Sequence, residues 1–440
     1  MKDAEIIFER LRSGTVPDRG LDQFAVGIDR PLTEISRQLD LAAAGEGAFK
    51  FLRGGYGCGK TFMSQYTILE ALKRNFAVSF VVVSPNDTQF HKFDEVYHKI
   101  VSQLRTNMAV SGALEDALDR WIGGIEDSIA AEFGDDASDF DKRVKTRFES
   151  DLVDLTKQST GNEFINVLKA YFEAKQEGDY QTASSLVAWI TGSKNIAAKA
   201  KNKAGIKGEI SSSSALLYLK GILSIIKKAG YKGLVVVIDE LETILRTRTD
   251  VRGKSLNGLR QIIDASKDFP GLLWVFTGTP EFFDSRKGVA GLEPLHERIR
   301  FETSGGFVSS KQSQLELKPF DKERLKQVAF KLREFYPASQ PERLFRLVDD
   351  EFITRLTDMV TSGLRGDVGV IPRQFLKQLV TVFDLVEEHD GSEGTEYIPK
   401  TAYQFPLGEL SPEDARLAAG APDDTEPAPA EGYAVEALEW

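Results

Sequence analysis

The sequence predicts an α/β fold with a parallel sheet at its core, a long helical insertion and an all-helical C-terminal domain. Two observations carry this prediction. A glycine-rich loop separates a short strand pattern at 48–53 from a helix pattern at 61–73. Apolar, β-branched runs then recur at 77–84, 234–240 and 272–279, separated by helical patterns. Continuous apolar runs are typical of strands buried on both faces, and strands that alternate with helices pair in parallel.

The first element is the glycine-rich loop, which matches the pattern G-x-x-x-x-G-K-[ST]. Its residues are Gly54, Gly55, Tyr56, Gly57, Cys58, Gly59, Lys60 and Thr61. Glycines let backbone amides turn toward a chain of phosphates, and the start of the following helix adds partial positive charge. The loop therefore predicts nucleotide binding, with Lys60 against the β and γ phosphates and the Thr61 hydroxyl as a ligand of Mg²⁺. We interpret Cys58 as a small filler rather than a reactive thiol.

The run 234–240 ends in two carboxylates, Asp239 and Glu240. At the carboxyl end of a buried strand, Asp239 is placed to hold the magnesium shell and Glu240 to orient and deprotonate an attacking water. The alternative is that the pair only caps a helix that starts near Leu241. The run 272–279 predicts another strand, whose polar end would place Thr277 or Thr279 beside the γ phosphate. A strand that simply ends in a glycine turn is the alternative there.

Composition limits the class of protein. The chain has 440 residues, of which 41% are hydrophobic and 28% charged, enough for two or three domains. We expect no membrane-spanning segment and no secretory signal, because no run approaches the roughly 20 apolar residues that cross a bilayer. One cysteine excludes a disulfide framework and favours the cytoplasm. The four histidines lack the spacing of a metal site.

The net charge of −11 is concentrated in the last part of the chain, where nine carboxylates after Leu407 face only Arg416. The rest is nearly neutral. The Pro- and Ala-rich composition of this tail predicts disorder, with 433–440 as a conceivable docking peptide.

The patterns along the chain predict its organisation. Further helices are expected at 4–11, 31–44, 215–229, 256–267, 322–335, 349–361 and 372–388, and 93–192 is helical without strands. The predicted units are an N-terminal helix and linker at 1–22, a nucleotide-binding core at 23–92 and 208–312, a helical insertion at 93–207, a helical lid at 313–408 and the acidic tail at 409–440. The lysine-rich stretch 194–207 is interpreted as a flexible linker rather than a contact for a phosphate backbone.

The order of these elements resembles that of the AAA+ ATPases, especially the branch related to origin-recognition proteins. The resemblance implies ATP and Mg²⁺ as cofactors and ATP hydrolysis as the activity. Val26 and Gly27 match a segment that lies against the base, although Ile28 replaces the arginine that commonly follows. Thr277 or Thr279 would be sensor 1. Arg298, or else Arg300, stands where such proteins carry an arginine finger, and Arg373 resembles a sensor 2 arginine.

A narrower resemblance rests on the Gly-Tyr-Gly loop at 55–57, the long insertion and the run 230–242. These features are similar to those of the BREX-type phage-defence ATP-binding proteins, and the length suits the smaller members, called BrxD. The resemblance implies a prokaryotic protein that works with a helicase and other defence components.

Three hypotheses follow: an ATPase that assembles on DNA or a partner, a slow nucleotide switch, and a scaffold whose nucleotide is structural. Direct contact with DNA is implied by the resemblance and has weak support from the lysine-rich stretch. No winged-helix signature follows Glu388, a departure from the origin-recognition pattern that leaves the mode of DNA contact open.

Overall fold

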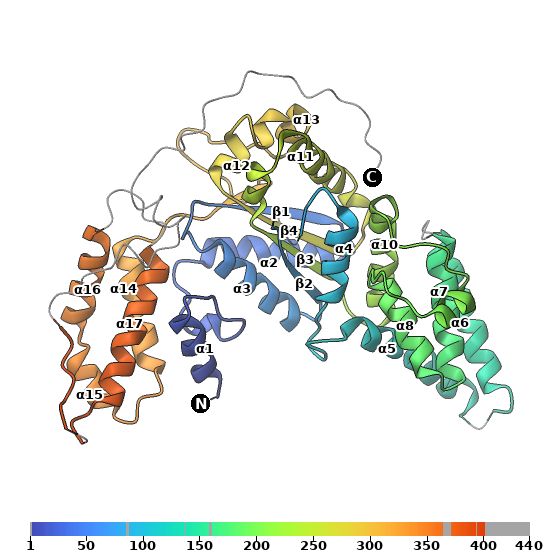
Figure 1. The fold of residues 1–440 in the computed structure, drawn as a ribbon, viewed down its shortest axis with the longest axis horizontal. Coiled ribbons are helices and arrows are strands. Elements are labelled where there is room, and N and C mark those ends of the chain that lie inside the picture. Colours follow the sequence, from blue (N-terminus) through green and yellow to red (C-terminus); the bar gives the residue numbers. More distant parts are fainter. Residues whose placement is uncertain are drawn as a thin grey trace.

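The computed structural model describes residues 2–84, 88–135, 137–157, 161–363, 371–392 and 394–400. The predicted acidic tail lies outside the described residues. A central sheet stands between two groups of helices, one formed by the C-terminal helices and the other by residues of the predicted insertion (Figure 1). None of the helices in these ranges is both long and apolar enough to cross a membrane.

The sheet has five parallel strands in the order β2-β3-β4-β1-β5. They are β1 (Ala48–Arg53), β2 (Ala77–Val82), β3 (Leu234–Asp239), β4 (Leu272–Gly278) and β5 (Gln314–Glu316). The first four confirm the predicted strands. The three-residue strand β5 is too short to give a pattern, and it begins the range predicted for the helical lid. Because β1, β4 and β3 run parallel, the glycine loop after β1 and the carboxylates at the end of β3 lie at the same edge of the sheet, one strand apart.

Helices cover both faces of the sheet, which makes three layers. Val235 and Val237 of β3 pack in one core with α2 (Asp29–Ala43) and α3 (Lys60–Lys73). Val236 and Ile238 point to the opposite face, because side chains alternate along a strand. They share a core with α4 (Phe93–Ser102), α10 (Ser212–Lys228), α11 (Thr249–Asp264) and α13 (Glu293–Ile299).

The helical pattern predicted for 93–192 is confirmed where the structure describes it, and Arg105 adds an isolated bridge to Val78. After α4 come α5 (Ala113–Phe133), α6 (Phe140–Lys157), α7 (Asn162–Gln176), α8 (Tyr180–Ile190) and α9 (Ala198–Ala204). The helix α9 corrects the interpretation of 194–207 as a flexible linker. Lys199 and Lys203 of this helix pair with Asp179 and Glu177 at 2.6 and 2.5 Å, so carboxylates of the same group of helices hold it in place.

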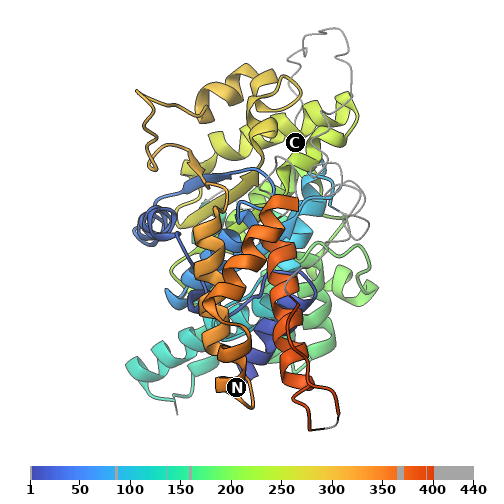
Figure 2. The ribbon, with the colours of Figure 1, turned by 90° about the vertical axis from the view of Figure 1, so that its left-hand side faces the viewer.

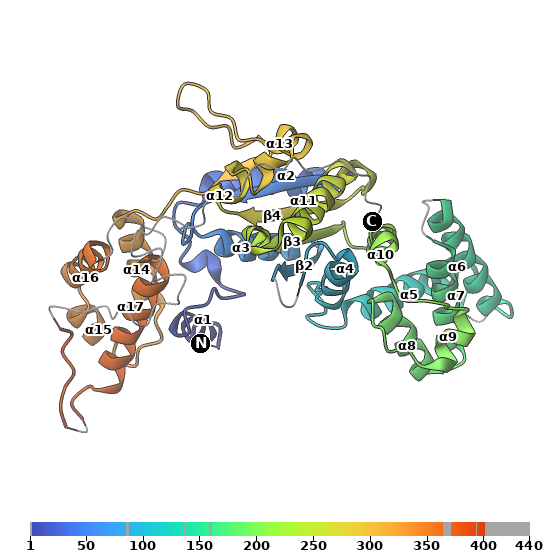
Figure 3. The same ribbon diagram turned by 45° about the horizontal axis from the view of Figure 1, so that its top comes forward.

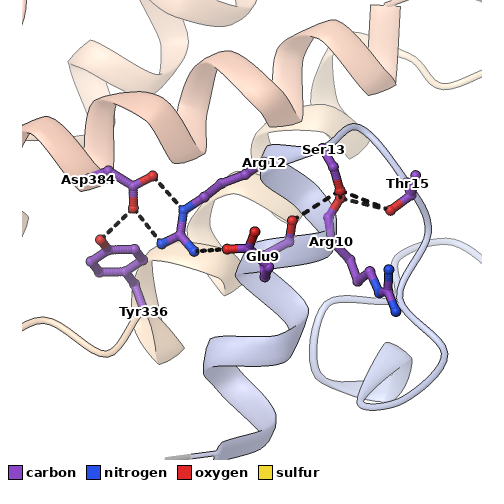
Figure 4. A network of polar contacts seen from close by, with 7 residues as sticks. All are labelled: Glu9, Arg10, Arg12, Ser13, Thr15, Tyr336 and Asp384. Carbon is purple, nitrogen blue, oxygen red and sulfur yellow. Dashed lines mark hydrogen bonds and ion pairs between the residues drawn. The ribbon is translucent and has the colours of Figure 1, made fainter.

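The C-terminal helices form the second group (Figure 2). They are α14 (Lys322–Phe335), α15 (Pro341–Leu347), α16 (Asp350–Gly363) and α17 (Ile371–Glu388). The N-terminal helix α1 (Lys2–Arg12) belongs to the same core, where Phe8 packs against Phe335, Tyr336 and Phe383. Arg12 contacts both carboxylate oxygens of Asp384 at 2.7 Å, and Tyr336 donates to the same carboxylate (Figure 4). The first and last helices of the described chain, α1 and α17, are therefore packed together.

Short elements complete the chain: η1 (Leu21–Gln23), η2 (Leu241–Arg246), η3 (Ser266–Asp268), α12 (Pro280–Asp284) and η4 (Val289–Gly291). The segment between α13 and β5 projects from the body of the protein (Figure 3). Phe307 at its turn is 82% exposed.

Candidate functional site

The glycine loop connects β1 to α3, as its pattern predicts. Gly57 and Gly59 have φ angles of 68° and 82°, a region that side chains disfavour. At Gly54 a Cβ atom would stand 3.0 Å from Cys58 Cβ and 3.1 Å from the Leu317 carbonyl oxygen. The glycines of the pattern are thus required by backbone conformation and by close packing, and the resulting cradle fits a chain of phosphates.

Lys60 begins α3 and lies almost fully buried beneath the loop. Its Nζ atom is 2.9 Å from the Gly54 carbonyl oxygen, 3.1 Å from that of Gly55 and 3.5 Å from Glu242 Oε1. The ring of Tyr56 lies 5.2 Å from the same ammonium group. The lysine is therefore held at the loop by two carbonyls, a carboxylate and an aromatic face.

Asp239, at the end of β3, connects the loop to the strand β4. Thr61 Oγ1 donates to its Oδ2 over 3.0 Å, and the Thr277 hydroxyl donates to its Oδ1. Asp239 is 2% exposed, so both hydroxyls reach it inside the protein. This arrangement fixes the carboxylate next to the threonine that begins the helix after the loop.

Glu240 follows with a left-handed backbone, at φ 64°. Its amide donates to Thr277 Oγ1 over 3.0 Å, and its side chain is exposed at the site. Glu240 stands at the N-cap position of η2, but within the described residues its side chain makes no capping hydrogen bond to that helix. A non-glycine residue in this conformation is strained, and such strain is concentrated at functional sites.

The two candidate threonines have different contacts. Thr277 bonds to Asp239 and to the amide of Glu240. Thr279 instead caps α12, where its hydroxyl accepts a hydrogen bond from the Phe282 amide over 3.3 Å. Of the two, Thr277 is therefore the one joined to the carboxylates.

A cavity of about 330 Å³ opens over the loop. Several predicted residues line it: Val26, Tyr56, Gly57, Gly59, Lys60, Thr61, Asp239, Glu240 and Arg373. Gly27, Gly54, Gly55 and Cys58 lie behind this surface; Gly27, at φ 68°, packs against the side chain of Arg324. This volume lies at the lower end of the range for small-molecule sites.

One wall of the cavity is apolar and was not foreseen. It combines Leu11, Val16, Pro17 and Phe24 of the N-terminal segment with Phe320, just before α14, and with Leu325, Val328 and Leu376 of α14 and α17. Gly14 lies against the side chain of Arg373, since a Cβ atom there would be 3.4 Å from the arginine Cγ. No motif marks these residues, because the wall forms only where the N-terminal segment packs against the C-terminal helices.

Sequence reasoning also missed Glu242, Thr243 and Arg246, which line the cavity from η2. The available signal was their position directly after the Asp239–Glu240 pair. They stand on a short 3₁₀ helix that begins directly after Glu240.

The two candidate finger arginines lie outside the lining of this cavity. Arg298 of α13 forms an ion pair with Asp264 of α11. Arg300 lies 2.6 Å from Glu302. Both are partly exposed.

The oxygen atoms at the loop fit a magnesium ion shared with a nucleotide. Within the described ranges, no three His, Cys, Asp or Glu residues are grouped to hold a metal by themselves. Thr61 and Asp239 offer two oxygen donors, and Mg²⁺ usually completes its shell with phosphate and water oxygens.

Comparison with known proteins identifies the family of the chain. A search of curated proteins found no match. A family model described as "BREX system ATP-binding protein BrxC/D" matches residues 1–402, which include every residue that lines the cavity. The chain therefore belongs to the BREX system ATP-binding protein BrxC/D family.

Proposed function

We propose that the chain is an AAA+ ATPase that hydrolyses ATP with Glu240 as the general base. The observation that carries this proposal is that Lys60, Thr61, Asp239 and Glu240 line a single cavity. Membership of an ATP-binding family supports ATP as the substrate. Hydrolysis is proposed because a carboxylate such as that of Glu240 can deprotonate an attacking water molecule.

The geometry of the site supports a separate role for each of these residues. Lys60 contributes positive charge to the β and γ phosphates. Thr61 and Asp239 would hold Mg²⁺, which neutralises charge that develops on the phosphates. Thr277 fixes the backbone of Glu240 through its amide, so the carboxylate can orient and deprotonate a water molecule. The sequence resemblance makes Thr277 the sensor 1 residue.

The apolar wall is the proposed site for the adenine base. Val26, Val16 and Phe24 lie there with residues of α14 and α17. Arg373 enters the same cavity from α17, as expected of a sensor 2 arginine that closes a helical lid over the phosphates. The base would then contact α1, the core and the C-terminal helices together.

The arginine finger is proposed to act across subunits. Arg298 and Arg300 lie outside the lining of the cavity of their own chain, which supports a role at the cavity of a neighbouring copy. Guanidinium groups stabilise the charge of the transition state. Hydrolysis would then require an oligomer.

DNA, a helicase and other defence proteins remain proposed partners in a prokaryotic cytoplasm, and the BrxD-like assignment within the family rests on length. The lysine-rich stretch gives DNA contact less support than its sequence suggests, because Lys199 and Lys203 are already paired with carboxylates. A salt-dependent gel shift that is lost when these lysines are reversed in charge would support contact. No binding at low salt would reject it.

A slow switch or scaffold that binds partner proteins without contacting DNA is the second candidate. It is favoured by the walls of the cavity, which come from α1, the sheet edge and the C-terminal helices. A bound nucleotide would join these parts even without turnover.

The deciding experiment combines phosphate release with mass by light scattering. The parent protein should release phosphate from ATP, and Glu240→Gln should bind ATP without releasing it. With ATP and Mg²⁺, the Glu240→Gln protein should grow to a larger defined oligomer. An unchanged mass with slow turnover would favour the switch, and stoichiometric nucleotide that is never hydrolysed would favour the scaffold.

A further inference from the structure

Lys60 is committed to three oxygen atoms within the protein. A lysine ammonium group has three N–H donors. The two loop carbonyls and Glu242 Oε1 all lie within 3.5 Å of Nζ. Lys60 is 8% exposed, so little of it is open to further partners. A phosphate that reaches this ammonium group must therefore replace at least one of these oxygens.

Glu242 is the contact that is easiest to replace. It is 7% exposed and lines the cavity beside Lys60. Among the described residues, no donor lies within hydrogen-bond distance of its second oxygen, Oε2. Burial raises the pKa of Glu242, and the neighbouring Lys60 only partly opposes this effect. A buried carboxylate with one unpaired oxygen and a 3.5 Å ion pair is poorly satisfied, whereas the two carbonyl contacts are shorter.

We propose that Glu242 is a positioning residue that competes with the β and γ phosphates of the nucleotide for Lys60, and so sets the affinity for nucleoside di- and triphosphates. The proposal rests on the phosphate-binding role of Lys60 in the proposed function. It separates Glu242 from Glu240, which the proposed function assigns to the attacking water.

Two physical effects act in the same direction. The carboxylate holds Lys60 in place, and its negative charge in the cavity repels phosphates. Removing the charge should release the lysine and reduce the repulsion together. Glu242→Gln keeps the size of the side chain and changes only its charge and hydrogen bonding.

The experiment measures the dissociation constants of ATP, ADP and AMP for the full chain by calorimetry. Glu242→Gln should bind ATP and ADP about tenfold more tightly, a typical coupling for a close charged pair. The affinity for AMP should stay unchanged, because its single phosphate does not extend to Lys60. Glu240→Gln is the matched control, since it removes one carboxylate from the same cavity and should produce a smaller gain. Equal affinity for ATP, weaker binding of ATP, or an equal gain for AMP would each overturn the proposal.

A double-mutant cycle separates competition for Lys60 from general repulsion. In a Lys60→Ala background, most of the gain from Glu242→Gln should disappear. A gain of the same size in that background would overturn the proposal. If Glu242→Gln fails to fold, as judged by circular dichroism, Glu242→Asp withdraws the carboxylate from the lysine and should give a gain of a few fold.

Phosphate release distinguishes this inference from the proposed function. A parent protein that binds ATP without hydrolysing it, while Glu242→Gln still binds more tightly, would reject the ATPase proposal and keep the role of Glu242. If the parent hydrolyses ATP normally and Glu242→Gln leaves the affinities unchanged, the ATPase proposal is kept and the role of Glu242 is rejected.

Discussion

Thr61 Oγ1 lies 3.0 Å from Asp239 Oδ2, although 178 positions separate the two residues in the chain. The contact joins the glycine loop to the strand β3 and sets two magnesium-type oxygen donors side by side. It explains why a loop motif and a distant pair of carboxylates form one site.

The first prediction concerns Asp239. Asp239→Asn should keep nucleotide binding in the absence of Mg²⁺ but lose the gain in affinity that Mg²⁺ gives, because an amide is a weaker magnesium ligand. Phosphate release should fall by about 100-fold or more. Calorimetry with and without Mg²⁺ measures the first effect. A magnesium response equal to that of the parent would show that Asp239 is not in the metal shell.

The second prediction separates the two threonines. Thr277→Val removes the hydroxyl that bonds to Asp239 and to the Glu240 amide, so phosphate release should fall about 10- to 100-fold with little change in ATP affinity. Thr279→Val removes the cap of α12 and should cost about 1 kcal/mol of stability while turnover is retained. Turnover assays and urea denaturation of both variants test this. The reverse pattern would assign sensor 1 to Thr279.

The third prediction tests whether Arg298 acts across subunits. Arg298→Ala alone and Lys60→Ala alone should both be inactive. A mixture should recover part of the phosphate release, because a Lys60→Ala subunit can offer its arginine to the intact cavity of an Arg298→Ala subunit. Asp264→Asn is the control, since it breaks the Arg298–Asp264 pair without removing the arginine. An Asp264→Asn protein that is as inactive as Arg298→Ala would indicate a structural role for the pair.

The fourth prediction follows from a buried ion pair behind the loop. Glu34 of α2 is 3% exposed and lies 2.6 Å from Lys50 Nζ of β1. Burial by itself would raise the pKa of Glu34, but hydrogen bonds from Arg37, Lys50 and Gln38 together lower this pKa from 4.5 to about 2. Because the pKa of Glu34 is lower in the folded than in the unfolded protein, the ionised carboxylate stabilises the fold. This stabilisation is complete above about pH 4.5 and is lost as the pH falls through about 2.

Glu34→Gln should therefore lower the free energy of unfolding by about 3 kcal/mol at neutral pH. Burial lowers the pKa of Lys50, so the variant leaves a buried lysine without its carboxylate. The difference in the free energy of unfolding between parent and variant should become smaller as the pH falls below 4.5. Urea denaturation between neutral and acid pH measures it, with the exposed Glu9→Gln as control. A difference in the free energy of unfolding that stays constant with pH would contradict the lowered pKa of Glu34.

The fifth prediction concerns the packing of α1 on α17. Asp384→Asn weakens the contact with Arg12 that Figure 4 shows, and should cost about 1 to 2 kcal/mol because Tyr336 shares the same carboxylate. ATP affinity should fall with it, since Leu11 and Val16, which lie on either side of Arg12 in the sequence, line the cavity. Asp390→Asn, also in the C-terminal region but away from Arg12, is the control. Unchanged ATP affinity in a destabilised Asp384→Asn protein would show that α1 does not support the site.

Much of the site could be predicted because its signals are local. Gly57 and Gly59 are required by the φ angles of the loop itself, and the run before Asp239 has the composition of a buried strand. The periodicity of apolar residues likewise predicts α3 and α14, since a helix buries one face at a fixed repeat.

The sequence by itself thus determined the loop, the carboxylates and the strand and helix order. Only the tertiary structure decided that Thr277 rather than Thr279 meets Asp239, that β5 extends the sheet, that α1 provides a cavity wall and that Glu242 holds Lys60. Each of these contacts depends on which segments pack together. The residues around one partner do not indicate which distant residue it will meet. Local conformation is set by adjacent residues, whereas contacts across the chain are set by the burial of whole faces.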